Sequence, residues 1–493
     1  MTRPGQRASK SRLASWLGWA GFDAVSRLAL MTGSTIVFSR LLEPRDFGVT
    51  ALVLTIVTVA AIFVGAPFEE ALTQKKHLRA SHLRAALGAS WLVGLVILAL
   101  SVVAGRTLAS FYGEPEIAAL LPIAMSSIFF SGHSDILTAL ARRLRRFNEV
   151  AYATMMGHVI GIGISVALAF MGYGLWALVG QRLLVVIARA LILQARIGFL
   201  ITPSWSSSHI GELGRFAGVS FLSRLTDTLT YLAFNNLVQI FYGTAMLGQV
   251  NMAMRLIEPI RGAITATGHN LAFTFFARAQ SDMNALRKLG DEIVSQSAFL
   301  TTPVFFGIAA VAPLLLPLVA GPGWDDAVTI AVCLSIASAI GVPAGLFFTA
   351  FSAQARPEYS FYSLIVGLLA IILVLTGFAW LGPISVGLSR IAGDAIRAIF
   401  AVGLPLQGFD WPRRQRFAAL APAWILSGAM GAAVAVLHRM VGAEHPLLQL
   451  VVLIPAGVAI YLALLAIFAR QRAATLFAHL PIARLTTGRP ASP

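Results

Sequence analysis

Long apolar stretches separated by short polar ones follow one another along almost the whole chain. About twenty apolar residues cross a bilayer as a helix, and we find fourteen stretches of that length. Their approximate limits are 15–38, 47–68, 84–105, 117–140, 151–171, 173–195, 216–240, 247–273, 293–317, 327–351, 360–380, 384–406, 418–438 and 447–469. The pattern predicts an all-α polytopic membrane protein with about 14 transmembrane helices.

Positive charge alternates between successive connections. Twenty-five lysines and arginines lie in the two tails and in every second connection, whereas four lie in the remaining connections. Lysine and arginine concentrate in cytoplasmic loops. The split therefore predicts an even number of helices and places both termini in the cytoplasm.

Two segments about 200 residues apart resemble each other. Phe47-Gly48-Val49 follows the first span and Leu247-Gly248-Gln249 follows the seventh. The match predicts two parallel six-helix lobes plus two extra C-terminal helices. The predicted divisions are a cytoplasmic N-terminal tail (1–14), an N-lobe (15–205), a C-lobe (206–406), the last two helices (407–469) and a cytoplasmic C-terminal tail (470–493).

The composition supports a membrane protein and excludes several other classes. Of the residues, 57% are hydrophobic and 12% are charged, about half the charged fraction of a soluble protein. The basic excess fits cytoplasmic loops, so we predict no nucleic-acid partner. Neither a nucleotide-binding phosphate loop nor a zinc-protease motif occurs, and there is one cysteine, Cys333. We therefore predict no catalytic residues, metal or cofactor, and no enzyme activity.

Arginines inside the predicted spans are the strongest indication of function. Eight occur there: Arg27, Arg182, Arg189, Arg224, Arg255, Arg261, Arg390 and Arg397. Five acids accompany them: Asp23, Asp135, Asp227, Glu258 and Asp394. An arginine at the middle of a bilayer costs at least about 2.5 kcal/mol, and such residues usually face the interior of a helix bundle. The excess of positive charge predicts an anionic cargo.

Helical spacing groups these charges into candidate sites. We predict that four arginines bind the cargo and that acids on the same helix faces orient them. The arginines are Arg27, Arg224, Arg255 and Arg261, and the acids are Asp23, Asp227 and Glu258. Pro259 should bend the helix beside the last group. The alternative is that each set is a self-neutralising group that helps its helix to insert.

A second rank of candidates comprises Arg182, Arg390, Asp394, Arg397, His133 and Asp135. His133 and Asp135 could form a proton relay, because histidine titrates near neutral pH. They lie two residues apart and so point to different helix faces, which favours separate polar contacts. Two glycine pairs, Gly157 with Gly161 and Gly341 with Gly345, predict close helix packing.

Three short motifs resemble those of a known family. Residues 39–51 (SRLLEPRDFGVTA) resemble the ARLL-x-P-x-DFG start typical of polysaccharide exporters in the multidrug/oligosaccharidyl-lipid/polysaccharide superfamily. Residues 70–76 (EALTQKK) are similar to that family's ALIQ-[RK]-K segment, and residues 142–147 (RRLRRF) to its basic R-x-x-RF loop. The nearest resemblance is to the Wzx-like lipopolysaccharide and exopolysaccharide flippases. Residues 66–70 (APFEE) depart from the family pattern, which has small apolar residues there.

The resemblance implies two lobes around a central cationic cavity, alternating access and a polyprenyl-pyrophosphate-linked oligosaccharide as cargo. It also implies a bacterial inner-membrane location, membrane lipids as surroundings, and a polysaccharide polymerase and other assembly proteins as partners. A cation-coupled multidrug exporter of the same superfamily and a lipid II flippase remain alternatives. A membrane polysaccharide polymerase or ligase is disfavoured, because no large outer loop is present in the sequence.

Overall fold

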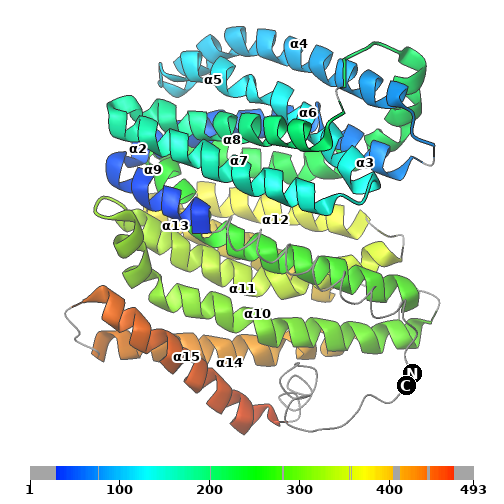
Figure 1. Ribbon diagram of the computed structural model, residues 1–493. Coiled ribbons are helices and arrows are strands. Elements are labelled where there is room, and N and C mark those ends of the chain that lie inside the picture. Colours follow the sequence, from blue (N-terminus) through cyan, green and yellow to red (C-terminus); the bar gives the residue numbers. More distant parts are fainter. Residues whose placement is uncertain are drawn as a thin grey trace, which may run out of the picture. The chain divides into compact units, whose positions relative to one another are not determined.

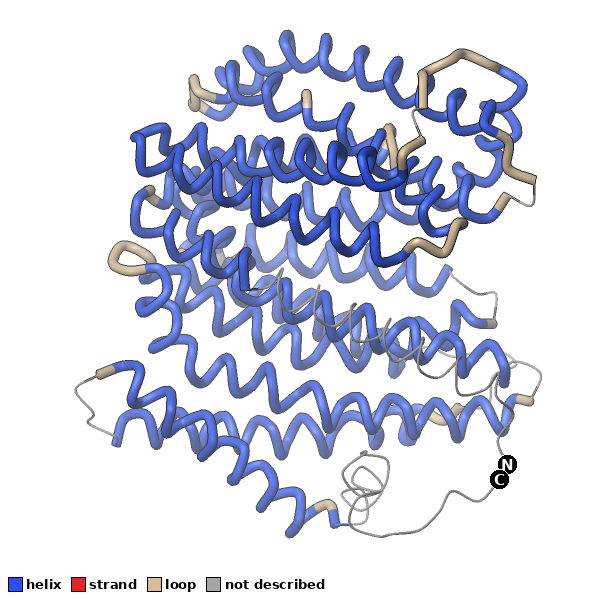
Figure 2. The backbone as a smooth tube through the Cα atoms, viewed as in Figure 1, coloured by secondary structure: helices blue, strands red, loops and turns tan. Residues whose placement is uncertain are grey.

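The computed structural model describes residues 29–470 except 76, 200, 280–281, 355, 357, 404–410 and 441–444. In this part of the chain the secondary structure is helical throughout, with loops between the helices (Figure 2). A helical stretch at 29–41 precedes the labelled helices, which run from α2 to α15 (Figure 1). The predicted all-α class is confirmed.

Most of the predicted spans lie within helices of the structure, but 66–74 was not predicted as a separate helix and the predicted span 117–140 is divided at Ser126. The helices are α2 (Pro44–Ile62), α3 (Ala66–Gln74), α4 (Ala80–Tyr112), α5 (Ile117–Met125), α6 (Ser127–Arg143), α7 (Phe147–Leu168), α8 (Gly174–Ile197), α9 (Ser207–Ala279), α10 (Met283–Ala320), α11 (Asp325–Ala353), α12 (Glu358–Gly377), α13 (Pro383–Gly403), α14 (Arg413–Met440) and α15 (Pro446–Phe468). A π-helical turn, Ala169–Tyr173, joins α7 to α8, and a 3₁₀ turn, Ala379–Leu381, precedes α13.

Nine helical stretches of the described residues are long and apolar enough to cross a membrane. One of them, Phe147–Ile197, has 51 residues and contains two predicted spans. The chain breaks between these spans at Gly172, whose φ of 91° favours glycine. The 73-residue α9 likewise contains two predicted spans and breaks at Gly243, with a φ of 81°. The polytopic membrane class is thereby confirmed.

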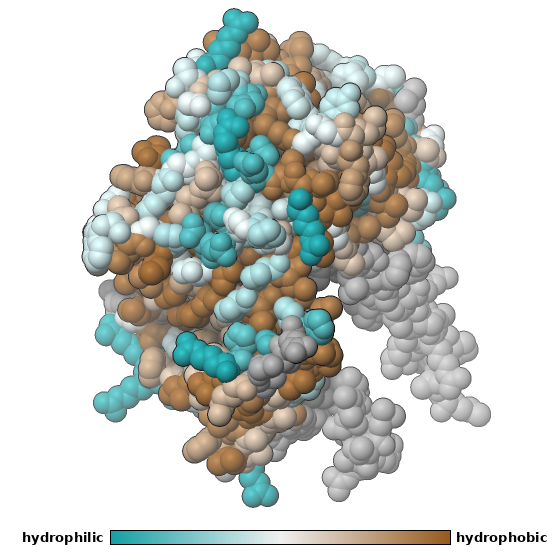
Figure 3. Space-filling model, turned by 90° about the vertical axis from the view of Figure 1, so that its left-hand side faces the viewer, coloured by the Kyte–Doolittle hydropathy of each residue, from teal (hydrophilic) through white to brown (hydrophobic). Residues whose placement is uncertain are grey.

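The chain divides into two compact units. The first comprises the described residues up to Arg255 together with Ala320–Gly323, and the second comprises Leu256–Val319 and the described residues from Trp324. Large apolar side chains are exposed on helices of both units, including Leu100 and Val103 of α4 and Leu369 and Leu373 of α12. Figure 3 shows hydrophobic residues spread over the surface among hydrophilic ones. Lipid is the solvent that such surfaces require.

Helices α4 and α5 of the first unit run in opposite directions (Figure 1), whereas α5 continues into α6 as one stretch, Ile117–Arg143. In Figure 1 the α4–α5 connection lies at the left-hand end of these helices and the α3–α4 connection at the right-hand end. Helices α7 and α8 pack closely because the predicted glycine pair leaves room for the α8 backbone. A Cβ atom at Gly161 would lie 2.4 Å from the backbone nitrogen of Val185, and one at Gly157 would lie 3.0 Å from that of Arg189. The expected close packing at this pair is confirmed.

The two glycines of the predicted repeat, Gly48 of α2 and Gly248 of α9, lie where these two helices cross, one on each helix. A Cβ atom at Gly48 would lie 1.9 Å from the carbonyl oxygen of Thr244, and one at Gly248 would lie 1.7 Å from that of Pro44. Within the first unit, α2 and the second half of α9 therefore cross backbone to backbone. A side chain at either glycine would force them apart.

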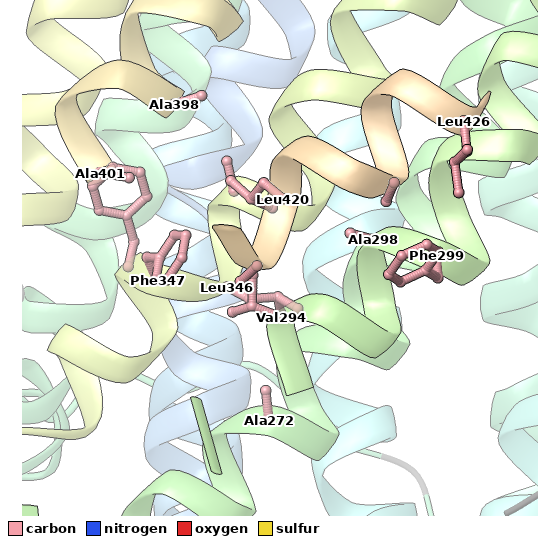
Figure 4. Close-up of a cluster of buried hydrophobic side chains, with 14 of the residues drawn as sticks. Ala272, Val294, Ala298, Phe299, Leu346, Phe347, Ala398, Ala401, Leu420 and Leu426 are labelled. Carbon is pink, nitrogen blue, oxygen red and sulfur yellow. The ribbon is translucent and has the colours of Figure 1, made fainter. Parts of the chain in front are cut away.

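The second unit is built around α11, α12 and α13, which pack along one another. Its apolar core joins α9, α10, α11, α13, α14 and α15, and ten of its residues are labelled in Figure 4. Buried hydrogen bonds attach the last two helices to α10. The Thr302 hydroxyl lies 2.7 Å from that of Ser427, and the Tyr461 hydroxyl donates to the carbonyl of Phe299 over 2.7 Å.

Candidate anion-binding site

The described residues contain three of the seven first-rank candidates. Those three are Arg255, Glu258 and Arg261, all on α9. Asp23 and Arg27 lie outside the described residues. Arg224 and Asp227 lie in α9, and the structure describes their backbone but not their side chains. The predicted grouping of the four arginines therefore stays a prediction.

Arg261 holds two carboxylates of the second unit. Its Nη1 donates to Glu258 Oε1 over 3.1 Å, one turn back on α9. Its Nη2 lies 3.5 Å from Oδ2 of Asp394 on α13. Arg397, one turn beyond Asp394, approaches the other carboxylate oxygen to 3.6 Å. The structure thus brings a first-rank pair together with two second-rank residues.

These residues form what we name the Asp394 cluster: Glu258, Arg261, Arg390, Asp394 and Arg397. Arg390 lies one helical turn before Asp394 on α13, a spacing that places two side chains on one face. Three arginines and two acids leave the cluster with one excess positive charge. A partly buried positive excess of this kind favours an anionic ligand.

Asp394 is deeply buried, with 5% of its surface exposed. Glycine on the neighbouring helix makes this possible, because a Cβ atom at Gly341 of α11 would lie 2.8 Å from its carboxyl carbon. Gly367 of α12 similarly leaves room for Arg397, whose Cδ would lie 2.7 Å from an added Cβ. Two helices therefore lack side chains at the points where the charged groups lie.

Arg255 belongs to the first unit and has different surroundings. Its Nε donates to Asn251 Oδ1 over 3.0 Å, and its guanidinium carbon lies 5.2 Å from the centre of the Phe47 ring. That distance is within the range of a cation–π contact. Arg255 therefore contacts an amide and an aromatic ring rather than the Glu258 carboxylate. Neither of these two partners carries a negative charge.

The second-rank residues of the first unit lie between α3, α6 and α8. His133 Nε2 lies 2.9 Å from Gln194 Oε1 of α8. The Asp135 carboxylate faces Gly65, where an added Cβ would lie 2.4 Å from Oδ2. The two side chains therefore contact different elements, as separate polar contacts require. Arg182 lies on α8, and Arg189 of the same helix donates to Thr138 Oγ1 over 3.1 Å.

Several residues that contact the charged candidates were not identified from the sequence. Asn251 lies one turn before Arg255, so helical spacing could have indicated it. Phe47 and Gly341 contact their charged partners across helices, and no local pattern predicts such contacts. Both positions stand in motifs that the sequence already marked, Phe47 in the DFG motif and Gly341 in a small-residue pair.

A second group of charges lies near the start of α9, before its membrane-spanning part. We name it the Glu212 cluster: Lys75, His82 and Glu212. Glu212 Oε2 accepts from Lys75 Nζ over 2.6 Å and lies 3.3 Å from His82 Nε2. His82 Nδ1 accepts the backbone N–H of Arg79, so Nε2 carries the proton and donates to Glu212. Hydrogen bonds from Lys75 and then His82 lower the pKa of Glu212 from 4.5 to about 2.

No group of three or more residues suited to a metal ion occurs among the described residues. The side chains of the Asp394 cluster include three arginines. Arginine presents a planar fork of N–H donors that matches phosphate oxygens. Apolar helices long enough to cross a membrane, with arginine–carboxylate ion pairs among them, define a polytopic membrane protein.

Known proteins agree with that class. The chain resembles a solved structure of the lipid II flippase MurJ in an inward closed conformation, with a TM-score of 0.73, 15% identity, and coverage of 92% of this chain and 98% of that one. It also resembles a solved structure of a multidrug resistance MATE family transporter of the MOP superfamily in an inward-facing conformation. The TM-score is 0.58 and the identity 17%, and the match covers 81% of this chain and 99% of that one. Identity this low shows the shared fold alone.

The sequence itself identifies the family. Residues 37–329 match the family described as polysaccharide biosynthesis protein, and the chain belongs to it. The succinoglycan biosynthesis transport protein ExoT of Rhizobium meliloti (strain 1021) is 23% identical over 331 residues, 67% of each chain. The lipopolysaccharide biosynthesis protein WzxC of Escherichia coli (strain K12) is 21% identical over 422 residues, 80% of each chain. The family expected from residues 39–51, 70–76 and 142–147 is confirmed.

Proposed function

We propose that this protein is a flippase that moves a polyprenyl-pyrophosphate-linked oligosaccharide from the cytoplasmic to the outer leaflet of the bacterial inner membrane. The cargo is a precursor of an exopolysaccharide or lipopolysaccharide. No covalent chemistry is needed. The protein has to carry a charged pyrophosphate and a polar sugar across about 30 Å of hydrocarbon.

Family membership supports the polysaccharide pathway. One relative is named as a transport protein of succinoglycan biosynthesis and another as a protein of lipopolysaccharide biosynthesis. Both names concern saccharide polymers, and the first assigns transport rather than synthesis. The transporter fold is the architecture such a step requires.

The Asp394 cluster is the observation that carries the proposal for an anionic cargo. Ion pairs join Arg261 and Arg397 to Glu258 and Asp394, and Arg390 lies one turn before Asp394 on α13. Charge-assisted hydrogen bonds to phosphate oxygens are about twice as strong as neutral ones. They offset part of the cost of removing phosphate from water. Arg255 of the first unit and the predicted Arg27 and Arg224 are further candidates for binding the cargo.

The charge pattern supports the proposed orientation. Within the first unit, the arginine-bearing connections α3–α4 and α6–α7 alternate with arginine-poor ones. Lysine and arginine concentrate in cytoplasmic loops, so we infer that these connections and both basic tails are cytoplasmic. Lipid-linked oligosaccharide, membrane lipids, a polysaccharide polymerase and other assembly proteins are then the expected partners.

Two alternatives share the fold. A cation-coupled drug exporter would favour an acidic interior, and the excess of arginine in the Asp394 cluster argues against it. A lipid II flippase handles a similar pyrophosphate, and the family match to polysaccharide biosynthesis favours the other saccharides. A polymerase or ligase would carry out covalent chemistry, which neither relative's name describes.

Export in a host that lacks the protein tests the proposal. Loss of the protein should leave complete lipid-linked oligosaccharide on the cytoplasmic leaflet, protected from an externally added glycosidase, and wild-type protein should restore its exposure. Truncated lipid-linked saccharide would instead indicate a synthetic enzyme. Drug sensitivity changing while polysaccharide stays normal would support the exporter.

A further inference from the structure

The two carboxylates that contact Arg261 hold it in unequal ways. Glu258 accepts a hydrogen bond of 3.1 Å, and its side chain is 40% exposed. Asp394 stands at 3.5 Å from the guanidinium, beyond the usual length of a hydrogen bond, with a side chain that is 7% exposed. Among the described residues, no donor makes a hydrogen bond to Asp394 Oδ2. The ion pair between Asp394 and Arg261 is therefore the looser of the two.

We propose that Asp394 is a displaceable counter-ion. It neutralises Arg261 when no cargo is bound, yields Arg261 to a phosphate group when cargo binds, and recovers it when cargo leaves. This inference rests on the proposed function, because it assumes that Arg261 binds the phosphate of the cargo. It adds a positioning residue and a means of release that neither the fold nor the family supplies.

The geometry determines which group moves. Asp394 is held between α11 and α13, with its carboxyl group directly over Gly341. Arg261 has a long flexible side chain on α9, 20% exposed, so it can turn toward a ligand. Phosphate oxygens form N–H···O bonds of about 2.7–2.9 Å with guanidinium groups. Such bonds are shorter than the 3.5 Å contact that they would replace.

Arg397 keeps the exchange from leaving a bare charge. It approaches Asp394 Oδ1 to 3.6 Å from the next turn of α13. A buried charge that loses its only partner destabilises a protein by several kcal/mol, and Asp394 retains a partner when Arg261 turns away. The carboxylate competes with phosphate for Arg261, which lowers the affinity for the cargo and speeds its release.

Two isosteric variants, one at each carboxylate that contacts Arg261, distinguish a displaceable counter-ion from an ion pair that only stabilises the fold. Purified protein in nanodiscs is titrated with farnesyl pyrophosphate, with farnesol as the uncharged control. Asp394→Asn removes the competitor, so affinity should rise about three- to tenfold, as expected for loss of a weak ion pair. Dissociation should slow, and export in cells should fall. Glu258→Gln removes the group that orients Arg261, so affinity should fall.

The outcomes distinguish failure of the proposed function from failure of the displaceable counter-ion. If wild-type protein does not bind farnesyl pyrophosphate more tightly than farnesol, the proposed function fails. If wild-type binds and Glu258→Gln weakens binding, but Asp394→Asn binds equally or less tightly, the displaceable counter-ion alone is wrong. Should Asp394→Asn not fold, Asp394→Glu replaces it: the longer carboxylate reaches nearer Arg261 and should weaken binding. Stronger or unchanged binding would overturn the proposal.

A charge exchange supplies a further check. Arg261→Asp combined with Asp394→Arg restores an ion pair and should restore the melting temperature lost in either single variant. A purely structural pair would also regain export. The displaceable counter-ion predicts that export stays absent, since the arginine then stands on the immobile side. Recovery of export by the double variant would contradict the proposal.

Discussion

The Asp394 cluster and the Glu212 cluster both place carboxylate against cations, yet they differ in solvent. Asp394 has a side-chain exposure of 7%, whereas that of Glu212 is 54%. The exposed carboxylate makes the shorter contacts, 2.6 Å to Lys75 against 3.5 Å to Arg261. Contact distance alone would therefore rank the two in the wrong order, because a charge pair acts more strongly where water is excluded.

Solvent also separates their roles. Exposed ion pairs contribute little to stability and weaken in salt. The Glu212 cluster is accordingly suited to holding a segment: it attaches the start of α9 to the residues around α4. Nearby, the backbone N–H of Ser204 donates to the carbonyl of Arg84 over 3.1 Å. The Asp394 cluster is suited to recognition, since its charges are stabilised by few groups and respond to each one.

The largest effect should come from removing the guanidinium that joins the buried cluster. Arg261→Ala should reduce polysaccharide export to background, because charge-assisted hydrogen bonds contribute about 1.5–3 kcal/mol each. Arg261→Lys should recover part of the activity, since lysine keeps the charge without the fork. Export is measured per amount of protein in the membrane.

Arg414→Ala serves as the control for that experiment. Arg414 is an exposed arginine in the first turn of α14, and its removal should leave export at the wild-type level. Full export in Arg261→Ala at normal abundance would show that the buried cluster has no part in transport.

The fold was more predictable from the sequence than the site. Apolar stretches indicated most of the helices from α2 to α15, though not α3 as a helix of its own, and the breaks at Gly172 and Gly243 fall between predicted spans, because the length of a bilayer crossing is a local property. The pairing of Glu258 with Arg261 is also local. The approach of Asp394 to Arg261 depends on how α9 and α13 pack, which no spacing within one helix can reveal.

Gly341 is a second case in which spacing within one helix does not predict a contact between helices. The sequence suggested Gly341 and Gly345 as one close-packing pair, but the structure separates them. A Cβ atom at Gly341 would meet the Asp394 carboxylate, and one at Gly345 would meet nothing within 4 Å. A glycine pair at helical spacing cannot show which member faces a neighbour.

This difference gives the second prediction, with a matched control. Gly341→Val should lower the stability of the protein by about 1–3 kcal/mol, the usual cost of overpacking, and should also reduce export by displacing Asp394. Gly345→Val carries the same helix-propensity change and should do neither. Thermal unfolding in detergent with a fluorescent reporter measures the first effect. Equal melting temperatures for the two variants would mean that Gly341 makes no special room for Asp394.

The third prediction concerns pH at the exposed cluster. The pKa of Glu212 is lowered to about 2, so its ion pairs hold fully above the ordinary value of 4.5 and are lost as pH falls toward 2. Pepsin cleavage within residues 201–212 reports detachment. At pH 4 the wild-type segment should resist cleavage and Glu212→Gln should be cut faster, whereas at pH 2 the two should be cut alike. A constant difference across this range would show that Glu212 does not hold the segment by its charge.

The smallest effect should come from Lys75, and it sharpens the comparison between the two clusters. Lys75→Met removes one exposed partner of Glu212 while His82 keeps the other, so the melting temperature should hardly change. Hydrogen exchange of residues 204–212 should nevertheless rise at low salt, and the difference from wild type should shrink at high salt, because exposed charges are screened. At the buried cluster, the melting temperature that Asp394→Asn loses relative to wild type should be lost at high salt as well. If both variants respond to salt in the same way, burial does not distinguish the two clusters, and the assignment of holding to one and recognition to the other is wrong.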